Sequence, residues 1–332
     1  MRIVVVSLTF LPNVGGLENI MAGLAESWSQ LGHQVTVYTQ TASTIPDNYS
    51  YKVIRTISPF TLYGAVKKAD ILLEANISLQ TFLVGLLHSK KWVVTHHLPY
   101  QHDKGWKGKL KNWLTKFSHN IAISHYIANQ LKGKATVINN FYHPTFKNNI
   151  SYTNRKKDLI FLGRLVSDKG VNLLIDSLKI VQEKIPECQL TIIGSGIEKE
   201  ALQKQANLLN LHNDIVFEGV VTGASLVSLL NEHKVMVIPS VWDEPFGVVA
   251  LEGLACGCAV VCADRGGLRE ASGNWGFYYK NNDSREMAAA IEHALMQYAH
   301  FAQQYQLVHK YLQEKQMPVI ALQYVTYFKT IV

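Results

Sequence analysis

The chain has 332 residues, 48% of them hydrophobic, a length and composition that favour two globular domains and exclude a disordered or fibrous protein. It contains no run of about 18 apolar residues, so we expect no membrane-spanning helix. The short apolar N-terminus reads as a first strand and not as a signal peptide, which favours a cytoplasmic location.

The formal charge of +7 is unevenly placed along the chain. Residues 1–150 carry 15 Lys and Arg against 6 Asp and Glu, whereas residues 151–332 carry 17 against 19. The basic first half should meet an anionic partner, such as a phospholipid surface or a lipid diphosphate. No recognised nucleic-acid motif is present, so we expect no nucleic-acid partner.

The first 38 residues read as strand, glycine-rich loop, helix and strand. Ile3–Ser7 is an apolar, β-branched run, and Leu17–Leu31 has a helical period. Short strands continue to alternate with helices, which predicts a parallel sheet with helices on both faces. Gly15 and Gly16 precede the first helix and can bring bare N–H groups towards a ligand, although a tight turn without a ligand is the alternative.

Two histidines, His96 and His97, end a strand that begins at Trp92. Ligands bind at the carboxyl ends of strands in such sheets, so either histidine is a candidate for a ligand contact. The alternative for each is a structural role in the packing.

The segment Lys104–His119 combines lysines with two tryptophans. On a helix its apolar side chains share one face: Trp106, Leu110, Trp113, Leu114 and Phe117. This composition is typical of a helix that lies on an anionic membrane surface, and equally of a packed helix whose aromatic face is core. Both interpretations remain open.

The polar stretch Asn148–Lys157 has no periodicity, so we expect the domain linker there. A strand then leads to Arg164 and Lys169, which can together neutralise a diphosphate. The Arg164 guanidinium can bind two phosphate oxygens at once, and Lys169 supplies a point charge; the alternative is a solvated pair on the surface. The next strands end at a turn containing Gly194 and at Val220, which is a candidate main-chain contact or plain core.

The stretch from Glu244 to Glu252 reads Glu-Pro-Phe-Gly-Val-Val-Ala-Leu-Glu and follows an apolar, strand-like run. Pro245 predicts the first helical residue, which would separate the two glutamates by about 12 Å along the helix axis. That is the reach from the sugar to the ribose of a nucleotide sugar, and the helix N-terminus between them suits a diphosphate. An ordinary buried strand-to-helix turn is the alternative.

This Glu-Pro-Phe-Gly-x-x-x-x-Glu pattern, with Gly-Arg and Lys-Gly upstream, resembles the signature of retaining glycosyltransferases of family 4 (glycosyl transferases group 1). The resemblance implies the α/β GT-B fold, with two Rossmann-like domains facing across a cleft and a C-terminal helix crossing back. It implies an acceptor-binding domain of residues 1–150 with 317–332, and a donor-binding domain of residues 151–316.

The resemblance also implies roles for single residues. Glu252 would accept from ribose hydroxyls, Glu244 would hold a sugar hydroxyl, and Arg164 and Lys169 would stabilise the leaving phosphate. His97 aligns best with a family histidine against the donor sugar, with His96 as the alternative. The other predicted substrate contacts are Gly15, Gly16, Gly194, Val220, Phe246, Gly247 and Val248.

Neither a metal nor a cofactor is expected. Three cysteines cluster at Cys256, Cys258 and Cys262, but no histidine follows nearby, so we expect buried thiols there and at Cys188. The sequence has no Asp-x-Asp pair that could clamp a divalent ion.

The resemblance implies a nucleotide-sugar donor, with UDP preferred over GDP because it is commoner in the family. The expected acceptor is lipid-linked or a glycan, in the synthesis of cell-envelope polysaccharide or glycolipid. Two other classes stay open: a nucleotide-sugar epimerase or hydrolase of the same fold, and a two-lobed sugar-binding protein.

Overall fold

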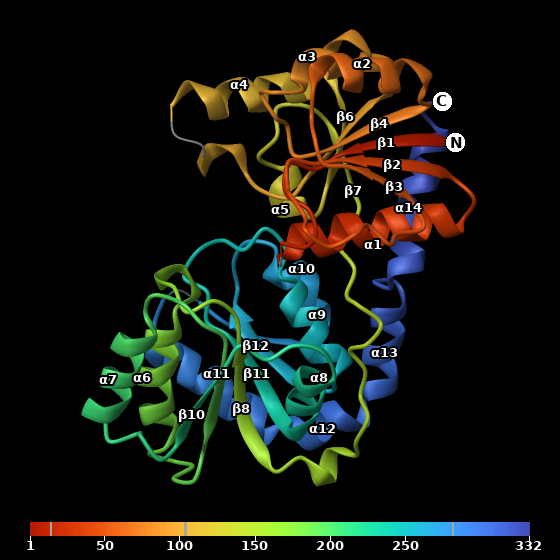
Figure 1. Cartoon of the computed structure of the whole chain (residues 1–332). Coiled ribbons are helices and arrows are strands. Elements are labelled where there is room, and N and C mark those ends of the chain that lie inside the picture. Colours follow the sequence, from red (N-terminus) through yellow and green to blue (C-terminus); the bar gives the residue numbers. More distant parts are fainter. Residues whose placement is uncertain (14, 103–104, 281) are drawn as a thin grey trace. The chain divides into compact units, whose positions relative to one another are not determined.

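The computed structural model describes residues 1–13, 15–102, 105–280 and 282–332 (Figure 1). The chain divides into two compact units. Unit 1 comprises Met1–Phe141 and Lys315–Val332, and unit 2 comprises Tyr142–Glu314. Within the described ranges, no helix is both long enough and apolar enough to cross a bilayer.

Among the described residues, unit 1 holds a parallel sheet of seven strands in the order β3-β2-β1-β4-β5-β6-β7. The strands are β1 (Arg2–Val6), β2 (Gln34–Tyr38), β3 (Lys52–Ile54), β4 (Ile71–Ala75), β5 (Trp92–His96), β6 (His119–Ala122) and β7 (Ala135–Val137). The helices are α1 (Gly16–Gln30), α2 (Pro59–Lys68), α3 (Phe82–Leu87), α4 (Trp106–Leu114), α5 (His125–Ala128) and α14 (Met317–Lys329).

The first strand of this sheet is apolar from Ile3 to Val6, because both of its faces are buried there. Ile3 and Val5 point into the core beneath α1 and α14, whereas Val4 and Val6 point into the core beneath α2, α3 and α4. Figure 1 shows these two helical layers on opposite faces of the sheet.

The C-terminal helix α14 belongs to unit 1, which confirms the predicted return of the chain to its first domain. The indole N–H of Trp28 donates to the carbonyl of Ala321 at 3.1 Å, and the rings of Tyr324 and Phe328 pack on Trp28. Burial of these large rings stabilises the return by several kcal/mol, at about 25 cal/mol per Å² of apolar area.

The predicted single helix over Lys104–His119 is not present as such. Lys104 lies outside the described residues, α4 ends at Leu114, a 3₁₀ turn covers Thr115–Phe117, and β6 begins at His119. The apolar side chains that were predicted to share one face are therefore not all buried, because a nine-residue helix that packs on a sheet buries only one stripe of its surface. Leu114 is buried, whereas Trp106 remains 65% exposed.

Unit 2 holds, in its described part, a parallel sheet of six strands in the order β10-β9-β8-β11-β12-β13. The strands are β8 (Lys157–Leu162), β9 (Leu190–Ile193), β10 (Ile215–Gly219), β11 (His233–Ile238), β12 (Ala259–Ala263) and β13 (Gly276–Tyr279). The helices are α6 (Val171–Val181), α7 (Lys199–Leu208), α8 (Gly223–Glu232), α9 (Val248–Ala255), α10 (Leu268–Ser272), α11 (Ser284–Met296), α12 (Tyr298–Gln303) and α13 (Tyr305–Gln313).

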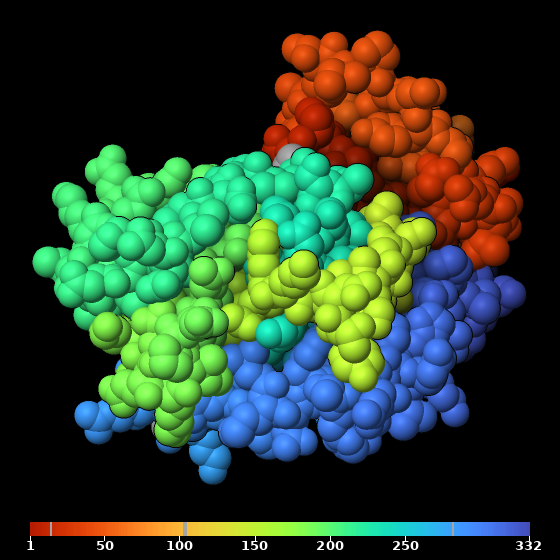
Figure 2. Space-filling view, turned by 90° about the horizontal axis from the view of Figure 1, so that it is seen from below, coloured from red at the N-terminus to blue at the C-terminus, as the bar shows by residue number. Residues whose placement is uncertain are grey.

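The polar segment Asn148–Lys157, in which we expected the linker, packs on unit 2, where it forms part of the yellow surface in Figure 2. Arg155 is 3% exposed and donates to the carbonyls of Leu230 and His233. The backbone N–H of Asn149 donates to Asn231.

Two features of unit 2 differ from what the sequence predicts. The helical period of Met287–Tyr305 predicts one helix, but the structure divides this stretch among α11, α12 and α13. The breaks have a tertiary cause, because Tyr298 donates to the carbonyl of Gly257 and the ring of Phe301 is buried. The edge strand β13 was not predicted at all.

Candidate active site

The candidate site of unit 2 lies where the strand order reverses, between β8 and β11. The connection after β8 runs to one side of the sheet and the connection after β11 to the other, which leaves a crevice at their carboxyl ends. The loop after β8 carries Lys169, and the loop after β11 carries Glu244. These two predicted residues, 75 positions apart, meet at this point.

The carboxylate of Glu244 is held by two donors. Its Oε1 atom accepts from the Nζ atom of Lys169 at 2.5 Å and from the Oγ atom of Ser240 at 2.7 Å. The Lys169 ammonium also lies 5.6 Å from the ring centroid of Trp242. Because both charged side chains are largely buried, the pair is fixed by its surroundings and is not a mobile surface ion pair.

The two loops pack directly on each other. Gly170 has a left-handed φ of 64°, and a Cβ atom at this position would lie 2.1 Å from the carbonyl oxygen of Pro239. The backbone N–H of Val241 donates to the carbonyl of Asp168 at 3.0 Å. The glycine after Lys169 therefore permits the close approach that brings the lysine to Glu244.

The prediction that α9 begins at Pro245 was wrong, because α9 begins at Val248. Gly247 precedes it with a φ of 99°, and a Cβ atom there would lie 2.5 Å from Leu268. The ring of Phe246 is buried, and the N–H of Gly267 donates to the carbonyl of Glu244 at 2.7 Å. These tertiary contacts hold the stretch as a loop, so Glu244 precedes the helix and the axial spacing of about 12 Å does not apply.

The loop nevertheless presents free donors. In the described chain, the backbone N–H groups of Phe246, Gly247 and Val248 donate to no protein acceptor. Three consecutive unpaired N–H groups at the start of a helix form a site for an anion or for sugar oxygens. This is where the predicted main-chain contacts were placed.

Glu252 lies within α9 and is only partly accessible. Burial raises the pKa of its carboxyl group to about 7. No hydrogen-bond or ion-pair partner is recorded for this side chain anywhere in the described ranges. A largely buried carboxyl group without a partner is well suited to accept hydroxyl groups from a ligand.

The remaining predicted residues of unit 2 surround the same strand ends. Arg164 follows β8 with an exposed side chain that has no partner among the described residues. Gly194 follows β9 at a φ of 140°, where a Cβ atom would lie 1.8 Å from the carbonyl oxygen of Gly163. Val220 follows the edge strand β10 and is 69% exposed, which excludes the core alternative.

In unit 1, Gly15 and Gly16 lie at the start of α1, after the first strand. A Cβ atom on Gly15 would lie 2.3 Å from the carboxylate of Glu18, so that carboxylate already occupies part of the helix N-terminus. Because Glu18 supplies the negative charge that such an end favours, this loop suits neutral hydroxyl groups better than a phosphate.

The two histidines of unit 1 differ clearly. His96 is fully buried and both ring nitrogens are bonded, Nδ1 to the Tyr100 hydroxyl at 2.8 Å and Nε2 to Asn120 at 2.9 Å. The ring of His97 has one recorded bond, from Nε2 to Thr95 Oγ1 at 3.2 Å, and its Nδ1 atom has no partner among the described residues. His97 is therefore the histidine available to a ligand.

Burial and, as a smaller cause, the neighbouring His96 together lower the pKa of His97 to about 3, so the ring is neutral at physiological pH. The backbone at this strand end is held by Asn76, whose Oδ1 atom accepts from the N–H of His97 at 2.8 Å. Asn76 itself has a left-handed φ of 62°.

Several supporting residues were not identified from the sequence: Asn76, Glu18, Ser240, Trp242 and Arg265. Arg265 donates to the Asp243 carboxylate at 2.6 Å and to the Val241 carbonyl at 2.8 Å, and so braces the loop that carries Glu244. Only one signal in the sequence pointed to these residues, their position along the chain. Asn76, Ser240, Trp242 and Arg265 lie in loops that follow a strand, and Glu18 lies in the first turn of α1.

All four cysteines are buried, as expected. Within the described ranges, no three His, Cys, Asp or Glu side chains lie close enough to hold a metal ion together.

A family model for glycosyl transferases group 1 matches residues 144–306, and a model for Glycosyltransferase Family 4 matches residues 14–145. The chain belongs to this glycosyltransferase family. Arg164, Lys169, Glu244 and Glu252, which were predicted to contact a donor, all fall within the first match, and Gly15, Gly16 and His97 fall within the second.

Curated relatives of this glycosyltransferase chain match over part of its length. An uncharacterized glycosyltransferase of Methanocaldococcus jannaschii is 38% identical over 144 residues, which is 42% of this chain and 36% of the relative. A phosphatidyl-myo-inositol mannosyltransferase of Mycobacterium tuberculosis is 35% identical over 119 residues, 36% of this chain and 31% of the relative. The chain thus spans about a third of the length of the curated relatives it matches.

Solved structures match the whole chain and confirm the GT-B fold. Sucrose-phosphate synthase of Thermosynechococcus elongatus has a TM-score of 0.81 at 19% identity and covers 99% of this chain and 98% of its own. The Anabaena protein HepE in complex with UDP-glucose has a TM-score of 0.80 at 21% identity, with 99% and 100% covered.

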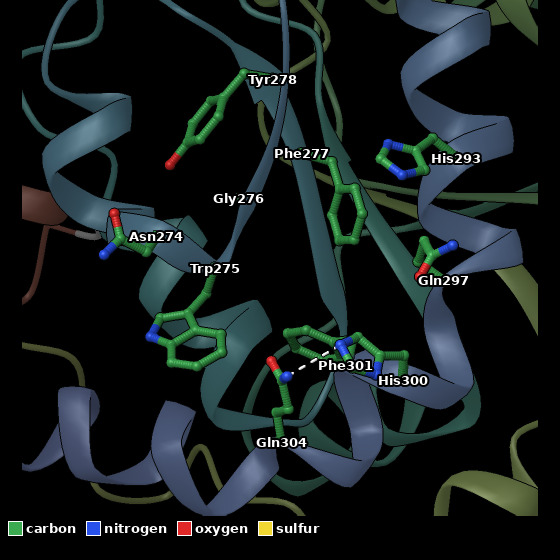
Figure 3. Close-up of a pocket in the computed structure, with 10 residues that line it drawn as sticks. All are labelled: Asn274, Trp275, Gly276, Phe277, Tyr278, His293, Gln297, His300, Phe301 and Gln304. Carbon is green, nitrogen blue, oxygen red and sulfur yellow. Dashed lines mark hydrogen bonds between the residues drawn. The ribbon is translucent and has the colours of Figure 1, made fainter.

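A separate pocket of about 380 Å³ lies on this glycosyltransferase between the start of β13 and the helices α11 and α12. Figure 3 shows the rings of Trp275 and Phe277 beside it, with the hydrogen bond of 3.0 Å between Gln304 and His300. The pocket adjoins the amino end of β13, whereas the candidate site lies at the carboxyl ends of the parallel strands. It is therefore not part of the candidate site.

Proposed function

We propose that this chain is a retaining glycosyltransferase that moves a sugar from a nucleotide sugar, preferably a UDP-sugar, to a lipid-linked or glycan acceptor. The observation that carries the proposal is the contact between Lys169 and Glu244 at the topological switch point, next to the free N–H groups of residues 246–248. Cationic, anionic and main-chain donor groups converge there as a sugar diphosphate requires.

Each part of the donor has a matching group. Glu244 holds a hydroxyl of the transferred sugar, and Glu252 accepts from the ribose. Arg164 is free to fork onto two phosphate oxygens, while Lys169 adds a point charge and keeps Glu244 in place. These groups and the start of α9 stabilise the leaving diphosphate electrostatically without a metal ion or other cofactor.

The family's front-side reaction gives the following balance. The acceptor oxygen forms a bond to the anomeric carbon on the face from which the diphosphate leaves. The bond from that carbon to the phosphate oxygen breaks, its electron pair goes to the leaving oxygen, and the acceptor proton is transferred to the same oxygen. Neutral His97 contributes a hydrogen bond to the sugar and no positive charge.

We assign the acceptor side to unit 1 and the donor side to unit 2. The nearest biological setting is the synthesis of cell-envelope polysaccharide or glycolipid at the inner face of a membrane, with Lys104–His119 in contact with anionic lipid. The mannosyltransferase relative, by its name, acts on a phosphatidylinositol, which supports a lipid acceptor.

The proposal is tested by measuring release of nucleotide from a panel of UDP- and GDP-sugars, with and without membrane extract. A transferase requires the extract and shows retained anomeric configuration in the product. Consumption of the donor without any acceptor would favour an epimerase or hydrolase, and no consumption of any donor would contradict both. A donor present at a concentration of about 100 times its Kd should also raise the free energy of unfolding by about 2.7 kcal/mol.

A further inference from the structure

One helical layer of unit 1 exposes many large apolar side chains. Helices α2, α3 and α4 cover one face of the sheet and bury Leu62, Val84 and Leu114, one from each helix, in the core beneath them. The opposite side of each helix therefore points away from the sheet, as Figure 1 shows for this layer of unit 1.

The outward side of this layer is apolar on all three helices. We call it the α2–α4 face. It comprises Phe60, Tyr63, Leu83, Leu87, Trp106, Trp113 and Phe117, which are 89%, 43%, 62%, 71%, 65%, 45% and 43% exposed. Single exposed apolar residues are normal, but a group of this size on three helices that cover one face of a sheet marks an interaction surface.

These side chains form stripes. Leu83 and Leu87 are four residues apart on α3, so they lie on one side of the helix. The ring of Trp113 meets that of Phe117 at 4.7 Å between centroids. The ring of Tyr63 meets that of His88, directly after α3, at 5.1 Å and so joins the stripes of α2 and α3.

The same part of the chain is strongly basic. Residues 58–118 contain three acids, Asp70, Glu74 and Asp103, against nine lysines: Lys67, Lys68, Lys90, Lys91, Lys104, Lys107, Lys109, Lys111 and Lys116. Glu74 is fully buried in the sheet, and Asp103 lies outside the described residues. The lysines at the ends of α2 and α3 and along α4 are therefore matched by few acids.

Unit 2 lacks this combination. Its largest exposed apolar side chains, such as Ile197, Leu208 and Met296, are on separate elements, and residues 142–314 carry 16 Lys and Arg against 19 Asp and Glu. The apolar and basic character is thus specific to one layer of one unit.

We infer that the α2–α4 face docks on an anionic lipid bilayer. Aromatic and leucine side chains enter the boundary between headgroups and acyl chains, while the surrounding lysines contact lipid phosphates. The inference rests on the proposed function in naming a lipid-bound acceptor, and it extends the membrane contact from one segment to three helices. The positive charge of the lysines complements the lipid phosphates of an anionic bilayer, and the apolar side chains complement its acyl chains. Such a surface needs no matching residues on a partner protein.

The test is flotation of the full chain with vesicles of phosphatidylcholine alone or mixed with phosphatidylglycerol, at low and high salt. We expect binding to the anionic vesicles that salt weakens. Phe60→Ser/Leu87→Ser/Trp106→Ser, one change per helix, should lower the affinity at least about tenfold. Lys67→Glu/Lys90→Glu/Lys107→Glu should do the same for anionic vesicles.

Two matched controls remove equivalent groups from unit 2: Ile197→Ser/Leu208→Ser/Met296→Ser and Lys179→Glu/Lys204→Glu/Lys310→Glu. Both should bind vesicles like the unaltered chain. Nucleotide release with a detergent-solubilised acceptor should be unchanged in all four variants, which separates failure of docking from failure of the transferase proposal.

Three outcomes would overturn the inference: no vesicle binding, equal binding by the α2–α4 variants and their controls, or self-association through this face in place of lipid binding. Self-association is measured by light scattering. It would appear as a dimer of the unaltered chain that is absent in Phe60→Ser/Leu87→Ser/Trp106→Ser, while that variant binds vesicles no differently from the unaltered chain.

Discussion

The ammonium of Lys169 and the carboxylate of Glu244 meet at 2.5 Å across the topological switch point of unit 2. Each residue comes from a loop that its neighbours hold in place, Gly170 against Pro239 on one side and Gly267 against Glu244 on the other. The pair therefore exists before any ligand binds, and a preorganised charge pair costs little reorganisation during a reaction.

The first prediction concerns the two glutamates. Glu244→Ala and Glu252→Ala should each cripple transfer, with kcat lowered about 10²- to 10³-fold for Glu244, while the protein stays folded. Circular dichroism melting and steady-state kinetics measure the two effects, and exposed Glu200→Ala is the control. Near-normal turnover in both variants would remove the basis of the site.

The second prediction separates the two cations. Arg164→Ala and Lys169→Ala should each lower kcat about 10²- to 10³-fold. The Arg164 side chain contacts no partner within the described part of the chain, so its loss should leave the melting temperature unchanged. Loss of Lys169 leaves a mostly buried carboxylate without its cation and should lower the melting temperature. Lys169→Ala/Glu244→Ala should be less impaired than the product of the single effects, as a double-mutant cycle would show. Strict additivity would mean that the pair does not act as a unit.

Local pattern was enough to predict most strands of the two sheets, although not the edge strand β13, and to indicate where a ligand should bind. Buried parallel strands are apolar throughout, so Ile3–Ser7 and Ala259–Ala263 were recognisable, and strand ends of such sheets hold the ligands. The start of α9 was not predictable from local pattern, because contacts with the loop around Gly267, about 20 residues further along the chain, fix the backbone at Phe246 and Gly247. The breaks after α11 likewise depend on Tyr298, whose partner Gly257 is distant in sequence.

The third prediction concerns pH and the buried carboxyl group of Glu74. Among the described residues, neither of its oxygens has a hydrogen-bond partner. Burial raises the pKa of this carboxyl group from 4.5 to about 7, although the nearby Thr81 hydroxyl and Trp92 indole partly oppose the rise. Between these values the folded chain holds a proton that the unfolded chain has lost. The contribution of Glu74 to the free energy of unfolding is therefore greatest at low pH. It falls by about 3 kcal/mol in total as the pH rises from 4.5 to 7.

Glu74→Gln should remove that dependence. Urea unfolding should show the variant more stable than the unaltered chain at pH 8 by up to about 3 kcal/mol, with the difference shrinking towards pH 5. Exposed Glu200→Gln is the matched control. A difference that is independent of pH, or that has the opposite sign, would contradict the burial argument.

The fourth prediction is that transfer survives chelation. Arg164, Lys169 and the free N–H groups before α9 supply the positive charge that a divalent ion would otherwise provide. Activity measured before and after dialysis against EDTA should agree within error. Loss of activity that Mg²⁺ or Mn²⁺ restores would show that charge neutralisation was wrongly assigned.

The last prediction separates His96 from His97, which the sequence left open. Both ring nitrogens of His96 are bonded in a fully buried position. His96→Ala removes one hydrogen bond each from the Tyr100 hydroxyl and Asn120 and leaves a cavity, so it should lower the free energy of unfolding by about 2–4 kcal/mol. His97→Ala should leave stability closer to normal and lower kcat. Because burial holds the pKa of His97 at about 3, the remaining pH–rate profile should contain no step from this ring between pH 5 and 8. His97→Asn, which keeps a neutral donor and acceptor, should restore part of the rate. If His96→Ala is the variant that stays folded and inactive, the histidine that faces the sugar is His96.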